Sequence, residues 1–154
     1  MDLLVKLYAL PPHDVADAPG DGVDVRRAFG AEKGIVRRWI AQRFGDRWAS
    51  ESEAAFARLP IACFVAIADN ELAGFACYDA TARGFFGPFG VAEGMRRRGI
   101  GRALLLTALR DMAGQGYGYA IIGAAGSIGF YRNGLDVIEI PDSAPGFYRG
   151  MLKA

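Results

Sequence analysis

The sequence predicts a single domain of the α/β (α+β) class, with helices packed on a β-sheet. Its 154 residues, 52% of them hydrophobic, suit one globular domain with a sizeable core. Two apolar runs, Ile61–Ala68 and Leu72–Asp79, are separated by a short polar turn and predict a β-hairpin. A third apolar run, Phe85–Val91, leads through a basic glycine turn into an amphipathic helix at Gly101–Ala113. Strands and helices therefore share this part of the chain.

Charge and hydropathy exclude several classes of protein. The formal net charge of +1 gives no overall attraction to nucleic acid. No apolar run reaches the length of a membrane span, about 18 residues. The start of the chain, MDLLVKLYALPPHD, has an acidic second residue and no basic segment before its short apolar part, which is unlike a signal peptide. We expect a cytoplasmic protein that binds neither nucleic acid nor membrane, with Cys63 and Cys77 as buried thiols.

The first part of the chain predicts two strands separated by a loop. Leu3–Leu10 alternates loosely between apolar and other residues, which predicts a strand that ends at the following prolines. The composition of the next stretch, up to Gly22, is typical of a loop. It contains the only histidine, His13, which we interpret as an exposed loop residue without a role. Val23–Arg27 is then predicted as a second, short strand.

Two helices are predicted before the hairpin. Apolar residues recur at helical spacing between Ala31 and Phe44, and Gly45 ends that pattern. Ser50 and Glu53 have the spacing of a capping box and predict the start of a second short helix that ends before Pro60.

The remaining elements follow the hairpin. Proline cannot donate to a sheet ladder, so Pro88 predicts a bulge or a gap in the pairing of the strand Phe85–Val91. The helix Gly101–Ala113 is followed by a strand at Tyr117–Ile122 and by a glycine-rich turn that leads to a short helix. Two final strands are predicted at Val137–Ile140 and Phe147–Leu152.

The turn between the strand Phe85–Val91 and the long helix has the properties of a diphosphate site. The first turn of a helix carries free N–H groups and the positive end of the helix dipole, so it attracts an anion. Gly99 and Gly101 let a phosphate approach the backbone and permit the φ values of an amide nest. Positive charge is concentrated at the same point by four arginines: Arg96, Arg97, Arg98 and Arg102.

A dinucleotide-binding turn and a polyanion-binding patch are two other interpretations of this stretch. A dinucleotide turn needs a small residue where the chain has Leu104, and an acidic residue about 20 residues later to hold the ribose. Residues 119–124 read YAIIGA, so the turn does not fit that pattern. A solvated basic turn, or a patch for polyanions such as RNA, stays open at this point.

The run Arg96-x-x-Gly99-x-Gly101, preceded by a strand and followed by a helix, resembles the pyrophosphate loop of the GNAT superfamily of N-acetyltransferases. The order of elements resembles that family from about Val23 onward, and Met1–Gly22 is less clearly similar. The resemblance implies a mixed, mostly antiparallel central sheet with a splayed parallel pair of strands. It also implies that acetyl-coenzyme A is the co-substrate, with Phe89 and Val91 holding the amides of its pantetheine arm.

The same resemblance implies a catalytic tyrosine. Tyr131 precedes Gly134 and Leu135, which is similar to the family's Y-x-x-x-G-F segment, although the spacing here is one residue shorter. We take Tyr131 as the candidate proton donor to the coenzyme A sulfur, with Tyr148 and Tyr78 as alternatives. Ala124 stands where many relatives have an asparagine, and Ser127 is the candidate to replace that cofactor contact.

The general base is left open by the sequence. Glu93 follows the strand at a position where relatives have an exposed acidic residue, and we interpret it as structural. Asp79 and Glu32 are the alternatives that would act through a water molecule.

We therefore expect an acetyl-coenzyme A-dependent N-acetyltransferase that acts by direct transfer in a ternary complex, without a metal. The alternative is a non-catalytic module that senses acyl-coenzyme A. The acceptor is expected to be a primary amine of a small molecule or a protein. A homodimer through the late strands, with the run Phe147–Leu152, is a further expectation.

Overall fold

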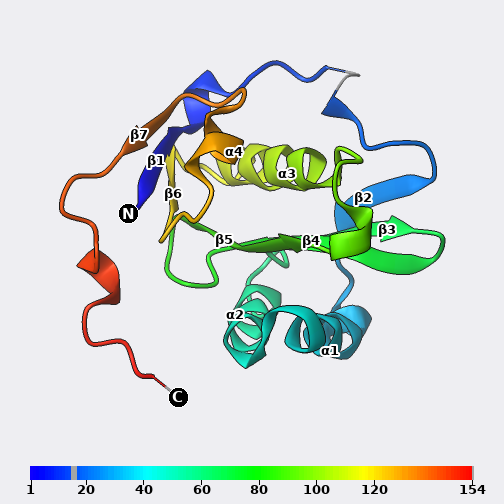
Figure 1. Ribbon diagram of the computed structural model, residues 1–154. Coiled ribbons are helices and arrows are strands. Elements are labelled where there is room, and N and C mark those ends of the chain that lie inside the picture. Colours follow the sequence, from blue (N-terminus) through cyan, green and yellow to red (C-terminus); the bar gives the residue numbers. More distant parts are fainter. Residues whose placement is uncertain (15–16, 154) are drawn as a thin grey trace.

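The computed structural model describes residues 1–14 and 17–153 and is built around one seven-stranded sheet (Figure 1). Along the sheet the strands follow the order β2-β3-β4-β5-β6-β1-β7. Only β5 and β6 pair in parallel among the described strands, and every other neighbouring pair is antiparallel. The strands are β1 (Leu3–Lys6), β2 (Val23–Arg27), β3 (Cys63–Ala68), β4 (Glu71–Tyr78), β5 (Phe85–Val91), β6 (Tyr119–Ile122) and β7 (Val137–Glu139).

Helices cover both faces of this sheet. Figure 1 shows α1 and α2 on one face and α3 on the other, with the short α4 beside α3. The helices are α1 (Lys33–Phe44), α2 (Asp46–Phe56), α3 (Ile100–Gly114) and α4 (Ile128–Arg132), with 3-10 turns η1 (Leu7–Ala9), η3 (Gly30–Glu32), η4 (Glu93–Met95) and η5 (Gly146–Tyr148). None of the described helices is long and apolar enough to cross a membrane.

The long helix α3 packs on the sheet through the apolar face that its sequence predicts. Leu104, Leu105, Leu109 and Met112 are each exposed by no more than 1%. Burial of such side chains contributes roughly 1.5–3 kcal/mol each, so this interface fixes where the helix begins relative to the sheet. The first residue of α3, Ile100, is equally buried, which holds the basic turn at the edge of the core.

The N-terminal strand is shorter than predicted and has an unexpected place. It ends at Lys6 instead of Leu10, because the chain then bends into η1. β1 lies between β6 and β7 and pairs antiparallel with both. Leu3 and Val5 point into the core, with exposures of 0% and 1%. The loop predicted to follow this strand includes residues 15–16, which lie outside the described residues.

The strands β4, β5 and β6 create an opening in the sheet. β5 pairs with β6 only through Phe85 and Phe86, because β6 ends at Ile122 while β5 continues to Val91. On the other side, the pairing of β5 with β4 is interrupted between Phe86 and Phe89. This confirms the predicted irregularity at Pro88 and the splayed parallel pair.

The start of the second helix, α2, differs from the prediction. The second helix begins at Asp46, not near Ser50, because Gly45 at φ +97° reverses the chain directly after α1. Ser50 is therefore inside α2, and the predicted capping box is wrong.

The prediction of buried thiols is confirmed. Cys63 and Cys77 lie opposite each other in the β3–β4 register and are free, buried thiols.

The predicted final strand Phe147–Leu152 is also wrong. Gly146 and Gly150 have positive φ values, so the backbone cannot stay extended, and the segment contains η5 instead. The ring of Phe147 contacts the ring of Phe85, with the two centroids 5.0 Å apart. The strand through which we expected a homodimer is thus not formed.

Candidate functional site

A cavity of ≈ 620 Å³ opens where β5 separates from β6, beside the start of α3. It is bounded by strand β5, the basic turn, α4 and the junction of α1 with α2. Its lining residues are Phe44, Trp48, Phe89, Gly90, Val91, Met95, Arg96, Arg97, Gly99, Gly101, Arg102, Ser127, Phe130 and Tyr131. Most of the predicted cofactor-binding residues are thus gathered at one place.

The backbone of the basic turn presents amide groups to this cavity. Arg97 at φ +67° and Gly99 at φ +75° both adopt the left-handed conformation, which turns the chain sharply into α3. Gly99 is the N-cap residue and has no side-chain cap, so the first N–H groups of the helix are left for an anion. A Cβ at Gly101 would lie 3.5 Å from the rings of Phe89 and Phe130. The lack of a side chain at Gly101 thus keeps the cavity open against the helix terminus.

These features fit the diphosphate of a coenzyme A-type ligand. The helix terminus supplies N–H donors and the positive dipole, and two exposed arginines on the wall, Arg96 and Arg97, supply charge. Arg98 is exposed but does not line this cavity. Its predicted contact with the cofactor stays a prediction, as do those of the other cofactor-binding residues.

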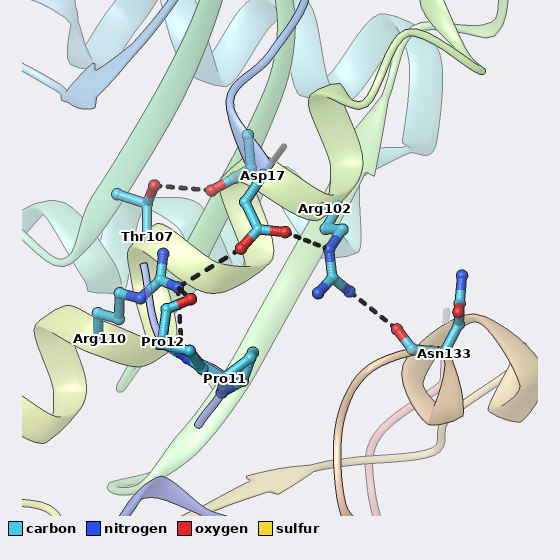
Figure 2. A network of polar contacts seen from close by, with 8 residues as sticks. Pro11, Pro12, Asp17, Arg102, Thr107, Arg110 and Asn133 are labelled. Carbon is cyan, nitrogen blue, oxygen red and sulfur yellow. Dashed lines mark hydrogen bonds and ion pairs between the residues drawn. The ribbon is translucent and has the colours of Figure 1, made fainter. Parts of the chain in front are cut away.

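Arg102 lines the cavity but already has protein partners (Figure 2). Its Nε lies 2.9 Å from Oδ1 of Asp17, and its Nη1 donates to the carbonyl oxygen of Asn133 at 2.8 Å. The other oxygen of Asp17 lies 3.8 Å from Nη2 of Arg110. The hydrogen bond from Arg102, with the charges of both arginines, holds the pKa of Asp17 below its usual value. Arg102 therefore links the N-terminal segment, the helix and α4.

The edge of β5 that faces the cavity is free for a ligand. Among the described strand pairings, residues Gly87 to Val91 have no partner on the β6 side. Phe89 and Val91 both line the cavity, and their contact with pantetheine stays a prediction. A ligand laid along this edge would pair with the backbone as an added strand does.

Helix residues that the sequence did not single out for the cofactor complete the wall. The ring of Phe44, at the end of α1, stacks on Trp48 of α2 with centroids 5.2 Å apart. Both rings also lie beside the buried Phe75, at 5.8 and 6.3 Å. The only sequence signal for them is aromatic character, which a buried core residue shares.

A second cavity of ≈ 360 Å³ adjoins the first and reaches the end of β6. It is lined by Arg47, Trp48, Glu51, Thr81, Phe86, Gly87, Pro88, Phe89, Ile122, Gly123, Ala124, Ala125, Gly126, Tyr131, Tyr148 and Met151. Trp48, Phe89 and Tyr131 line both cavities. The two cavities therefore meet at these three side chains.

The turn after β6 that forms a wall of the second cavity is held by the N-terminal residues. The N–H of Ala124 donates to the buried carboxylate of Asp2 at 2.8 Å, and the N–H of Ala125 donates to the carbonyl oxygen of Met1 at 3.1 Å. Ala124 itself has φ +48°, a conformation that alanine rarely adopts. The two residues that precede β1 thus hold this wall of the second cavity in place.

Tyr131 stands at the meeting point of the cavities. Burial raises the pKa of its hydroxyl to about 12, so the group stays protonated at neutral pH and can donate a proton. The two alternative tyrosines lie elsewhere. Tyr78 donates to Oδ2 of Asp111 at 2.5 Å and lines neither cavity, whereas Tyr148 lines the second cavity only.

Both alternative bases, Asp79 and Glu32, lie outside the two cavities, as does Glu93, which was interpreted as structural. Asp79 accepts hydrogen bonds from the hydroxyl of Tyr117 and the N–H of Gly84. Glu32 forms two hydrogen bonds with Arg26, which lower its pKa to about 2. The side chain of Glu93 is exposed on η4. The one acidic residue on the wall of either cavity, within the described chain, is Glu51, which the sequence analysis did not select.

Comparisons with solved structures identify the fold. A GCN5-related N-acetyltransferase from Sphaerobacter thermophilus superposes with a TM-score of 0.71 at 22% identity, over 89% of this chain and 47% of that one. The glucosamine N-acetyltransferase region of a fungal multi-domain GH3 β-N-acetylglucosaminidase gives 0.68 at 16% identity, over 89% and 19%. A GNAT family acetyltransferase from Brucella melitensis, solved in complex with acetyl-CoA, gives 0.55 at 20% identity, over 71% and 79%. The chain thus spans about half of the Sphaerobacter protein and about a fifth of the fungal one.

Sequence comparison assigns the family. No curated protein is significantly similar in sequence. The model of the acetyltransferase (GNAT) family, however, matches residues 34–135, which include both helices of the α1–α2 pair, the basic turn and Tyr131. The mixed sheet, its splayed parallel pair and this match lead to one conclusion: the chain belongs to the GNAT acetyltransferase family.

Proposed function

We propose that the protein is an N-acetyltransferase that moves an acetyl group from acetyl-coenzyme A to a primary amine by direct transfer in a ternary complex. The observation that carries this proposal is the pair of cavities that meet at Trp48, Phe89 and Tyr131. One cavity has a basic rim and a helix terminus suited to a diphosphate, and the other has a single carboxylate. Two reactants held on opposite sides of Tyr131 would meet in line.

Different residues of the chain would bind the cofactor, stabilise the oxyanion and protonate the departing sulfur. When bound, acetyl-coenzyme A supplies a thioester carbonyl that a neutral amine can attack. N–H groups on the open edge of β5 would donate hydrogen bonds to the oxyanion. The hydroxyl of Tyr131 is protonated and would give its proton to the departing sulfur. Arg96, Arg97 and the amides at Gly99 would hold the diphosphate and so orient the thioester.

Thiol release measured with acetyl-coenzyme A and a panel of primary amines tests this proposal. The panel contains alkylamines, arylalkylamines, aminosugars and peptides with a free N-terminus or lysine. We expect thiol release that depends on the amine, with the acetylated amine identified by mass spectrometry. Coenzyme A binding in calorimetry without transfer to any of these amines would favour an acyl-coenzyme A-sensing module instead. An absence of coenzyme A binding would overturn both.

A further inference from the structure

Glu51 is the one carboxylate that lines the second cavity among the described residues. It lies in the middle of α2, and its side chain is partly buried. Thr81, which follows β4, donates its hydroxyl to Oε2 of Glu51 at 3.1 Å. No other hydrogen bond or ion pair to Glu51 is found within residues 1–14 and 17–153, so Oε1 is available to a ligand.

The charged and titratable groups around Glu51 come from several elements. Arg47 lies one turn earlier on α2, lines the cavity with an exposed side chain and partly offsets the charge of Glu51. Tyr148 from the C-terminal segment and Tyr131 from α4 lie on other walls, and Cys77 is buried in β4. Burial raises the pKa of Glu51 and outweighs the opposite effects of Thr81 and Arg47. A raised pKa is the property that a carboxylate needs to accept a proton from an ammonium group near neutral pH.

The rest of the wall indicates what kind of amine would fit. Aromatic side chains form much of the surface: Trp48, Phe86, Phe89, Tyr131 and Tyr148. Their faces attract a cation and cover the apolar body of a ligand. Among the described residues, Arg47 is the only other charged one on the wall, and it would repel a second positive charge. A volume of ≈ 360 Å³, with Tyr148 and Met151 on the wall, suits a small molecule.

We infer that Glu51 is the residue that receives the acceptor, and that the acceptor is a small primary amine with one positive charge and a flat apolar body. This inference rests on the proposed function. Oε1 of Glu51 binds the ammonium group and takes one of its protons, which leaves the neutral amine. The amine nitrogen then forms a bond to the acyl carbon, and the bond from that carbon to sulfur breaks. Tyr131 protonates the sulfur, and the second amine proton leaves through water.

The test compares Glu51→Gln with Glu53→Gln. Glu53 lies on the same helix, pairs with Arg37 at 2.9 Å on the surface and lines neither cavity, so it provides the matched control. The probes are phenethylamine and benzylamine, with putrescine as a dication. For Glu51→Gln we expect kcat/KM to fall about 100-fold with unchanged coenzyme A affinity, and for Glu53→Gln a change below about twofold. Glu51→Asp should recover part of the activity.

Two readouts separate a role in proton transfer from a merely structural one. In the parent protein kcat/KM should rise with pH through the ionisation of Glu51, and this acidic limb should be absent from Glu51→Gln. Titration of the coenzyme A complex with phenethylamine should change the tryptophan fluorescence, because Trp48 lines the cavity, and binding should be weaker in Glu51→Gln. This binding is measured without turnover, so it tests the acceptor site independently of the transferase proposal.

The outcomes are distinct. Binding of phenethylamine that depends on Glu51, without thiol release, would support the acceptor site and contradict the transferase proposal. Transfer that proceeds equally well in Glu51→Gln, with the same acidic limb, would overturn the role of Glu51 and leave the transferase proposal in place. A preference for putrescine over both ring-bearing amines would overturn the assigned class of acceptor.

Discussion

The carboxylate of Asp17 lies 2.9 Å from Nε of Arg102, the third residue of α3 (Figure 2). A second contact joins the same segments, because the N–H of Gly20 donates to the carbonyl oxygen of Arg98 at 3.3 Å. Asp17 and Gly20 lie outside the family match at residues 34–135. In this protein the N-terminal segment therefore braces the basic turn.

Replacing Asp17 by Asn should lower the melting temperature in a pH-dependent way. Arg102 and Arg110 lower the pKa of Asp17, so its contribution to stability is fully present above the unfolded pKa of 3.8 and is lost as pH falls through the lower folded value. Thermal unfolding of the parent protein and Asp17→Asn should differ at pH 7 and converge below that range. Asp21→Asn, an exposed residue in the same segment, is the control. A difference that persists unchanged in acid would argue against the ion pair.

Replacing Gly90 by Ala should destabilise the protein through Phe44. A Cβ at Gly90 would lie 2.6 Å from Cζ of Phe44, whose ring is held against Trp48 and Phe75. We expect a loss of about 1–3 kcal/mol in the free energy of unfolding, measured with urea. In the Phe44→Leu background the same substitution should cost clearly less. Equal costs in the two backgrounds would show that the contact does not limit this position.

Replacing Gly101 by Val should abolish coenzyme A binding while the fold is kept. A Cβ at this position is in ordinary contact with Phe89, Phe130 and Val91, so alanine fits, whereas the methyl groups of valine would fill the cavity. We expect an affinity at least about 100-fold lower for Val, which is about 2.7 kcal/mol, and a smaller loss for Ala. Calorimetry measures both. Gly101→Ala should also unfold at a higher temperature, because alanine favours the helix.

Replacing Tyr131 by Phe should reduce turnover without affecting the cofactor. The hydroxyl is the one group removed, so we expect kcat to fall about 10- to 100-fold and the Kd of coenzyme A to stay within about twofold. Because the pKa of Tyr131 is raised to about 12, no loss of activity from its ionisation is expected up to about pH 10. A Tyr131→Phe variant with full kcat would show that another group is the proton donor.

Local sequence patterns were sufficient to predict the strand and the helix beside the first cavity. The strand Phe85–Val91 was predicted with its observed bounds, because its apolar run stops at the polar Glu93 and Gly94 that open the basic turn. The helix was predicted at Gly101–Ala113 and is observed at Ile100–Gly114. The prediction was accurate here because strand, turn and helix are contiguous, so one stretch of sequence carries the whole unit.

Which residues of α2 line the second cavity could not be found in this way. Glu51 and Glu53 are close neighbours on α2 with the same chemistry, yet one lines the second cavity and the other pairs with Arg37 on the surface. That difference depends on how α2 packs on the sheet, which no local pattern records. The place of β1 between β6 and β7 is also a long-range pairing, and the positive φ values of Gly146 and Gly150 prevented the final strand.

A crystal structure with acetyl-coenzyme A tests the central proposal most directly. We predict that the diphosphate lies against the amides of Gly99, Ile100 and Gly101 and that pantetheine follows the free edge of β5 at Phe89–Val91. The acetyl group should then lie beside Tyr131, at the entrance to the cavity that contains Glu51. A ligand bound elsewhere, with the basic turn closed by protein side chains, would contradict the proposed cofactor site.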